Sequence, residues 1–229
     1  MNITERKESK MILDLNRLPI KVDIEDVASL SDDDYTLARR NGLGASDASV
    51  YLGLMSQFGK DTLSLIKEKC SDTISDEERA IGQKENVRKG KDLEPLILKK
   101  AQDQLGIEVI KPTSMYRHKE FEFLTVNFDG VCKPKEDYIP VEAKFVSHAG
   151  EKYYNRADPN GIPDYYTAQL QQQMLCLNSP YGYLAALFDK GWIFHMFQID
   201  RQNRIINRII VEGFSVWEKI QAKIKNTGQ

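Results

Sequence analysis

Cysteine and histidine are scarce in this chain of 229 residues, which contains three of each. The cysteines are Cys70, Cys132 and Cys176, and the histidines are His118, His148 and His195. The cysteines are widely spaced and odd in number, so they indicate neither a disulfide framework nor a zinc knuckle. The histidines show no spacing typical of zinc or of a Ser-His dyad. We therefore expect any chemistry in this chain to come from carboxylates.

Long apolar runs are missing as well. Stretches such as residues 181–188 are far too short to span a bilayer, and residues 1–7 lack the apolar core of a signal peptide. We expect a cytoplasmic protein with no membrane partner. A chain of this length can bury a sizeable core. We predict a single domain over residues 1–229, with its motifs between residues 36 and 190.

Neither sign of charge is in clear excess, because 32 basic and 34 acidic side chains give a formal net charge of −2. This balance argues against a protein coated in positive charge for nonspecific nucleic-acid binding. Residues 23–34 hold six carboxylates and no Lys or Arg, so the rest of the chain carries a net charge of +4. A localised basic groove is therefore compatible with the composition.

Two apolar segments that each lead to a carboxylate stand out, at residues 123–130 and 139–144. In the second segment, strand alternation puts Glu142 and Lys144 on the same side. Together with Asp129, these groups suit a divalent metal beside a phosphate. The alternative is a hairpin turn at Asp129-Gly130 and a solvated Glu-Lys pair on a strand surface.

The N-terminal part divides into an irregular segment and a helix. Residues 1–22 show no strong period, and we expect a flexible arm or an interface strand through Met11-Ile12-Leu13. Ser31 is a plausible N-cap, followed by three aspartates in the first turn, where the helix dipole favours anions. Arg39 and Arg40 close this helix, and a structural role explains them as well as a functional one does.

A glycine-rich turn follows the helix. Gly42 and Gly44 permit a tight backbone approach, and Ser46 can cap a helix whose free N–H groups face an anion. With Arg39 a few residues upstream, this turn predicts a cradle for a terminal phosphate.

Residues 77–104 form the longest helical pattern before the strands, interrupted at Gly90 and Pro95. Pro95 fits best in the first turn of a new helix, which places Glu94 at the helix entry. Because apolar residues flank Glu94, its carboxylate can point inward, where it needs a partner or a metal.

The C-terminal half alternates strands and helices. The polar loop 150–163 contains Lys152 and Arg156 and fits either a nucleic-acid contact or a plain surface loop. A helix over residues 163–178 carries Tyr166 in its apolar stripe, with Gln169 on another side. Strands at 181–188 and 192–199 and a helix at 204–225 complete a mixed α/β sandwich.

Five ordered blocks together resemble one family. They are residues 39–48 (RRNGLGASDA), 90–95 (GKDLEP), 123–130 (FLTVNFDG), 141–144 (VEAK) and 166–171 (YTAQLQ). Their order and spacing resemble the phage lambda exonuclease and YqaJ-like viral recombinase group, a branch of the PD-(D/E)xK nucleases. The family signature has Pro where this chain has Phe128, and the interval from Asp129 to Glu142 is thirteen residues. Neither departure removes a ligand.

The resemblance implies a restriction-endonuclease-like α+β core with a central mixed β-sheet flanked by helices. It implies the site residues that follow. The metal ligands are Asp129, Glu142, the Ala143 carbonyl and Glu94; the further catalytic residues are Lys144 and Gln169; and the residues that contact DNA or its 5′ phosphate are Arg39, Ser46, Tyr166, Lys152 and Arg156. Two Mg²⁺ ions, or Mn²⁺ in their place, would stabilise the attacking and leaving oxygens.

The function implied by this resemblance is 5′→3′ degradation of one strand of linear double-stranded DNA from 5′-phosphorylated ends. The resemblance places it in phage or prophage recombination in a bacterial host, with a trimeric ring of copies and a single-strand annealing protein as partners. Two alternatives stay open. One is a DNA endonuclease of the same core with another polarity or structural preference, and the other is a noncatalytic DNA-binding scaffold.

Overall fold

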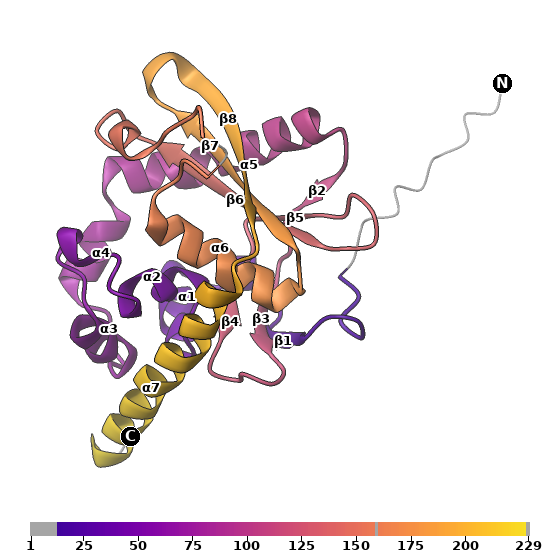
Figure 1. Ribbon diagram of the computed structural model, residues 1–229. Coiled ribbons are helices and arrows are strands. Elements are labelled where there is room, and N and C mark those ends of the chain that lie inside the picture. The colour runs from indigo at the N-terminus through magenta and orange to yellow at the C-terminus, as the bar shows by residue number, and fades with distance from the viewer. Residues whose placement is uncertain (1–12, 159, 228–229) are drawn as a thin grey trace.

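The computed structural model describes residues 13–158 and 160–227. It contains two β-sheets and seven α-helices in these ranges (Figure 1). The strands are β1 (Ile20–Ile24), β2 (Val109–Ile110), β3 (Met115–His118), β4 (Thr125–Val126), β5 (Gly130–Cys132), β6 (Ile139–Val146), β7 (Tyr181–Phe188) and β8 (Ile193–Asp200). The α-helices are α1 (Asp32–Ala38), α2 (Ala48–Tyr51), α3 (Thr62–Lys69), α4 (Asp76–Gly82), α5 (Glu85–Leu105), α6 (Asp164–Leu177) and α7 (Asn203–Thr227).

The larger sheet has five strands in the order β2-β5-β6-β7-β8. Strands β6 and β7 are parallel and the other pairs are antiparallel, so the sheet is mixed. Helices α5 and α6 pack on its opposite faces (Figure 1). Successive side chains of β6 point to opposite faces of the sheet, and Ala143 lies on the face covered by α5. The predicted central mixed sheet with flanking helices is confirmed.

The smaller sheet has the order β1-β3-β4. The chain leaves this sheet after Val126 and enters the larger one at Gly130, so Asp129 lies at the crossover between the two sheets. A Cβ atom at position 130 would lie 2.8 Å from Leu98 Cδ2 and 2.9 Å from Val109 Cγ1, which explains the glycine. The Asp129-Gly130 pair is therefore not a hairpin turn.

Two predictions about the elements are wrong. Helix α5 is continuous through Gly90 and Pro95, where we expected a new helix to begin. Pro95 is exposed, while Ile97 and Ala101 of the same helix are fully buried against the sheet. Such tertiary packing stabilises the helix despite the cost of an interior proline, which is about 3 kcal/mol.

The second correction concerns the N-terminal segment. Residues 13–22 are not a flexible arm, because Leu13, Leu18 and Ile20 are buried and β1 pairs with β3. The Lys119 ammonium also donates hydrogen bonds to two carbonyl groups in this segment. Residues 1–12, which include Met11 and Ile12 of the predicted interface strand, lie outside the described residues.

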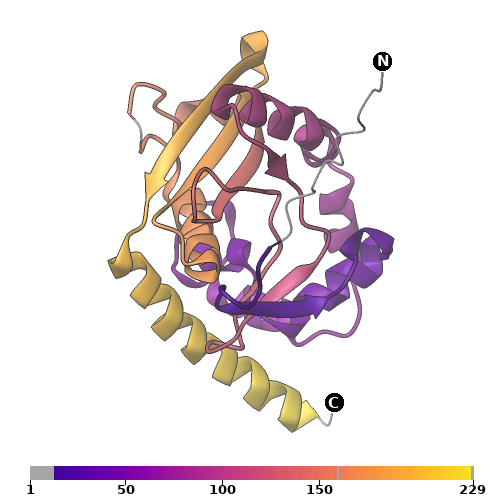
Figure 2. The same ribbon diagram turned by 90° about the vertical axis from the view of Figure 1, so that its right-hand side faces the viewer.

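The remaining helices lie at the side and base of the sheets. Helix α7 runs along the lower edge of the molecule in Figure 2 and packs on α2, α3 and α6. Ser31 caps α1 as predicted, since its hydroxyl accepts a hydrogen bond from the Asp34 N–H. Within the two described ranges, no helix combines the length and apolarity needed to cross a membrane.

Candidate active site

Asp129 lies beside the edge of β6, immediately before the first residue of β5. The pairing of β5 with β6 begins at Gly130, which lies opposite Val141. Two residues further along β6, the Ala143 N–H therefore has no partner in β5. The Asp129 Oδ2 atom takes this place and accepts a hydrogen bond of 3.0 Å from the Ala143 N–H. Because the N–H and C=O of one strand residue point the same way, the Ala143 carbonyl also lies on the Asp129 side.

Glu142 lies on the opposite face of β6 from Ala143 and is only 1% exposed. Its Oε1 atom accepts hydrogen bonds from the Lys144 ammonium and, at 2.6 Å, from Gln169 Nε2. Its Oε2 atom accepts a third hydrogen bond, of 2.6 Å, from Gln173 Nε2. A buried carboxylate requires such partners, and two of them come from successive turns of α6.

The negative charges at this site act on one another. Burial and the nearby Glu142 carboxylate raise the pKa of Asp129 well above its usual value, and the Lys144 ammonium only partly offsets them. Burial lowers the pKa of Lys144, but the charges of Glu142 and Asp129 outweigh burial and raise it overall. Lys144 therefore stays charged, and the carboxylates retain repulsion that a cation would relieve.

The donor atoms fit a hard divalent cation. Two carboxylates and a carbonyl are the oxygen ligands that Mg²⁺ takes in proteins. Glu94 is paired with a lysine, because its Oε1 atom lies 2.6 Å from the Lys111 ammonium. Its charge still contributes to the raised pKa of Asp129. In the part of the chain that the structure describes, no three acidic, His or Cys side chains gather as a metal site. The geometry thus brings together Asp129, Glu142 and Ala143, with Glu94 engaged elsewhere.

The predicted phosphate cradle lies beside these carboxylates. Arg39 Nη2 donates a hydrogen bond of 2.8 Å to Ser46 Oγ, and its guanidinium lies over the Tyr35 ring at 5.8 Å. We expected Ser46 to cap a helix, and this prediction is wrong. Gly44 is the N-cap of the short turn Ala45–Asp47, and its N–H donates to the Asp47 carboxylate.

Arg40, the neighbour of Arg39, has a structural role. Its guanidinium is buried and donates to the carbonyl oxygens of Ser71 and Thr73 and to Glu78. The two adjacent arginines are therefore distinguished by their surroundings, since only Arg39 lines the cavity beside the carboxylates.

A cavity of about 190 Å³ connects the carboxylates to the cradle. Its lining includes Arg39, Ser46, Asp129, Glu142, Lys144 and Gln169. A neighbouring hollow of about 450 Å³ shares Arg39, Ser46 and Gln169 and adds Tyr166. Residues that are far apart in the sequence thus form one continuous depression.

The other residues predicted to contact DNA are Tyr166 of α6 and, in the loop before α6, Lys152 and Arg156. The Lys144 ammonium lies 5.2 Å from the centre of the Tyr166 ring, so Tyr166 belongs to the site. Lys152 is exposed and lies over the Tyr153 ring. Arg156 is exposed, forms an ion pair with Glu151 and lies over the Phe188 ring, and it does not line the cavity.

Sequence reasoning missed Asn127 and the role of Gln173. Asn127 lines the cavity, its Nδ2 atom donates to the Tyr35 hydroxyl at 2.9 Å, and its Oδ1 atom is buried without a protein partner. The signal was available, because Asn127 precedes Asp129 by two residues and Gln173 follows Gln169 by four. These spacings place each pair on one side of an extended segment or a helix.

Comparison with known proteins agrees with this fold. The chain is 27% identical over 192 residues to the uncharacterized protein YqaJ of Bacillus subtilis (strain 168), covering 83% of this chain and 56% of that protein. The chain thus spans little more than half the length of this curated relative.

Two crystal structures of LHK-Exo, an alkaline exonuclease from Laribacter hongkongensis, superpose with a TM-score of 0.65 at 17% and 15% identity. One of them is a complex with dAMP. Each match covers 85% of this chain and 95% of that one. A phage related exonuclease from Haemophilus somnus 129PT gives a TM-score of 0.60 at 14% identity, covering 81% of this chain and 96% of the other.

These likenesses show that the fold is the restriction-endonuclease-like fold of alkaline exonucleases. The family model of the YqaJ-like viral recombinase domain matches residues 34–179, more than half of the chain and all the residues of the cavity described above. The chain belongs to the YqaJ-like viral recombinase domain family.

Proposed function

We propose that this protein is a metal-dependent 5′→3′ exonuclease that degrades one strand of linear double-stranded DNA from 5′-phosphorylated ends during phage-type recombination. The observation that carries this proposal is the shared cavity of the Arg39–Ser46 pair and the Asp129–Glu142 carboxylates. A site that holds a terminal phosphate next to the hydrolytic groups cuts close to a strand end. The viral recombinase family and the exonuclease names of the structural neighbours support the proposal.

Each residue of the cavity has a role in this reaction. Asp129, Glu142 and the Ala143 carbonyl would hold the cations, which when bound activate water and neutralise phosphate charge. The Lys144 ammonium, positioned by Glu142, binds the attacked phosphate or orients the attacking water. Gln169 holds the Glu142 carboxylate in place, and Arg39 with Ser46 binds the terminal phosphate.

The proposal includes the cofactor and the partners. Two Mg²⁺ ions serve the site, with Mn²⁺ as a substitute, and Glu94 joins the ligand set when Lys111 releases it. Three copies of the chain form a ring around DNA in the cytoplasm of a bacterial host, and a single-strand annealing protein receives the exposed strand.

Digestion of DNA in the presence of magnesium tests the central proposal. We expect progressive loss of one strand from linear duplexes with 5′-phosphorylated ends, slower loss from 5′-hydroxyl ends, and no cutting of circles. Lys144→Ala should abolish the cutting, while Arg39→Gln should remove the preference for 5′-phosphorylated ends. Cutting of circles would instead indicate an endonuclease, and no metal-dependent cutting would favour a binding module.

A further inference from the structure

A hollow of about 420 Å³ adjoins the 450 Å³ depression, which in turn borders the cavity that contains the carboxylates. Tyr165 and Tyr166 line this hollow and the 450 Å³ depression that leads to Arg39 and Ser46, so the two are continuous. The rest of its lining includes Phe58 and residues of the loop between β6 and α6. We call it the aromatic hollow.

A chain of ring contacts leads from the catalytic groups into the aromatic hollow. Tyr166 lies beside the Lys144 ammonium, and its ring centre is 4.6 Å from that of Tyr165. The Tyr165 ring is 5.7 Å from Phe58, which is 6.2 Å from Tyr153. Three separate elements supply these rings: α6 and the short turns Ser56–Phe58 and Glu151–Tyr153.

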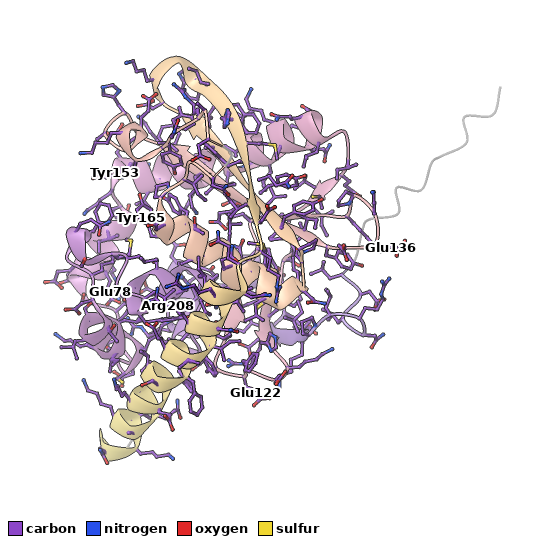
Figure 3. The ribbon with its side chains drawn as sticks, viewed as in Figure 1. Glu78, Glu122, Glu136, Tyr153, Tyr165 and Arg208 are labelled. Atoms are coloured by element: carbon purple, nitrogen blue, oxygen red, sulfur yellow. The ribbon has the colours of Figure 1, made fainter. Side chains whose placement is uncertain are left out.

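The two outer rings of this chain are open to solvent. Phe58 is 45% exposed and Tyr153 is 43% exposed. Figure 3 shows Tyr153 and Tyr165 on the same side of the molecule, well away from Glu122 and Glu136. Adjacent exposed aromatic side chains on an otherwise polar surface are typical of a binding site. Core packing therefore does not account for Phe58 and Tyr153.

The charge of the aromatic hollow favours a polyanion. Among the described residues that line it, Lys152 is the one charged side chain, and its ammonium lies 5.0 Å from the centre of the Tyr153 ring. Aromatic rings beside a basic side chain are the means by which proteins bind unpaired nucleotides, because every base has a face that stacks on a ring. In a duplex, neighbouring base pairs cover these faces.

We propose that Phe58 and Tyr153 form a stacking platform for unpaired bases of the DNA strand whose phosphate enters the carboxylate site. The proposal rests on the nuclease function and adds the state of its substrate, since the bases next to the cut must be unpaired to reach the two rings. Stacking recognises all four bases, so the platform holds the strand without selecting a sequence.

Binding of 5′-phosphorylated single-stranded oligonucleotides, with calcium in place of magnesium, tests the platform. Fluorescence anisotropy would compare intact oligonucleotides with others that carry abasic positions near the 5′ end. We expect Phe58→Ala and Tyr153→Ala each to weaken binding of the intact strand about tenfold, the size of one base–aromatic contact. The abasic strand should bind wild type as weakly as the variants bind the intact strand.

Two controls separate stacking from a structural role. Phe214 on α7 is 50% exposed and lies in a different groove, so Phe214→Ala should bind like wild type. Phe58→Tyr keeps the ring and should restore tight binding. If Phe58→Ala weakens binding of intact and abasic strands equally, or weakens neither, the platform is wrong.

Digestion of linear duplex by wild type, run in parallel, distinguishes failure of the platform from failure of the nuclease. Suppose that wild type cuts the duplex, but that the ring variants bind intact and abasic strands with the same loss of affinity or with no loss. That result would refute the platform and leave the nuclease function standing. Absence of cutting would refute the nuclease and, with it, the strand that the platform is proposed to hold.

Discussion

Asp129 combines a buried position with a raised pKa, which has a consequence for stability. The usual pKa of an aspartate is 3.8. Above this pH the folded protein keeps a proton on Asp129 that the unfolded chain has already released. The metal-free protein therefore loses stability as the pH rises above this value. Asp129→Asn should remove the loss and raise the melting temperature at pH 7 in EDTA. At this chain length, each 1 kcal/mol corresponds to about 2–4 °C.

Melting curves in EDTA and in magnesium would check this expectation. The advantage of Asp129→Asn should shrink as the pH falls toward 3.8, because the carboxyl is then protonated in both states. Magnesium should raise the melting temperature of wild type and leave that of the variant nearly unchanged. Asp137→Asn, an exposed change in the β5–β6 loop, serves as the control. An equal magnesium effect on wild type and Asp129→Asn would contradict the ligand assignment.

The residue scale also shows what local sequence reasoning can reach. Strand alternation predicted that Glu142 and Lys144 share a face, and their contact confirms it. The helical period is enough to put Gln169 and Gln173 on one side of α6, but it does not show that their two amides bind the two oxygens of Glu142. The pairing of Glu94 with Lys111 was beyond prediction, because it depends on where the chain lies after it leaves α5.

At the scale of elements, the crossover at Gly130 determines where Asp129 lies. A methyl group at position 130 would press on Leu98 of α5 and Val109 of β2. We expect Gly130→Ala to cost about 1–3 kcal/mol of stability, as overpacked cores do. It should also reduce activity more than stability alone explains, since the adjacent carboxylate would move.

Gly90→Ala provides the matched comparison. Gly90 lies inside α5, and a Cβ atom added there would meet no atom from outside its own helix within 4 Å. This change should therefore stabilise the protein by about 0.5–1 kcal/mol, the difference in helix propensity between the two residues. Urea unfolding of both variants measures the two effects. A Gly130→Ala protein as stable and active as wild type would show that the crossover tolerates displacement.

Elements with a strong period were predictable, whereas their connections were not. The stripe of apolar residues at helical spacing found α7, and continuous apolar runs found β7 and β8. The same signals could not divide residues 123–132 between two sheets, because burial patterns report which side of a strand is covered and not which strand it pairs with. Pro95 misled for a similar reason, since packing of α5 overrides its local preference.

At the scale of the whole molecule, the near balance of charge bears on how DNA is held. A protein with a formal net charge of −2 has little general attraction for a polyanion. Binding should therefore depend on a small number of phosphate contacts within the cavity and the adjoining hollows. The salt dependence of binding counts these contacts, because each releases about one cation from DNA.

Arg39 should be one of the contacts that this measurement counts. Binding of a 5′-phosphorylated duplex end, followed over a range of salt concentrations with calcium present, gives the slope of log K against log [salt]. Arg39→Gln should reduce the magnitude of this slope by about one. Arg208→Gln should leave the slope unchanged, because Arg208 pairs with Glu212 on α7, outside the cavity. An unchanged slope in Arg39→Gln would mean that the guanidinium holds Ser46 and Tyr35 in place without binding the phosphate itself.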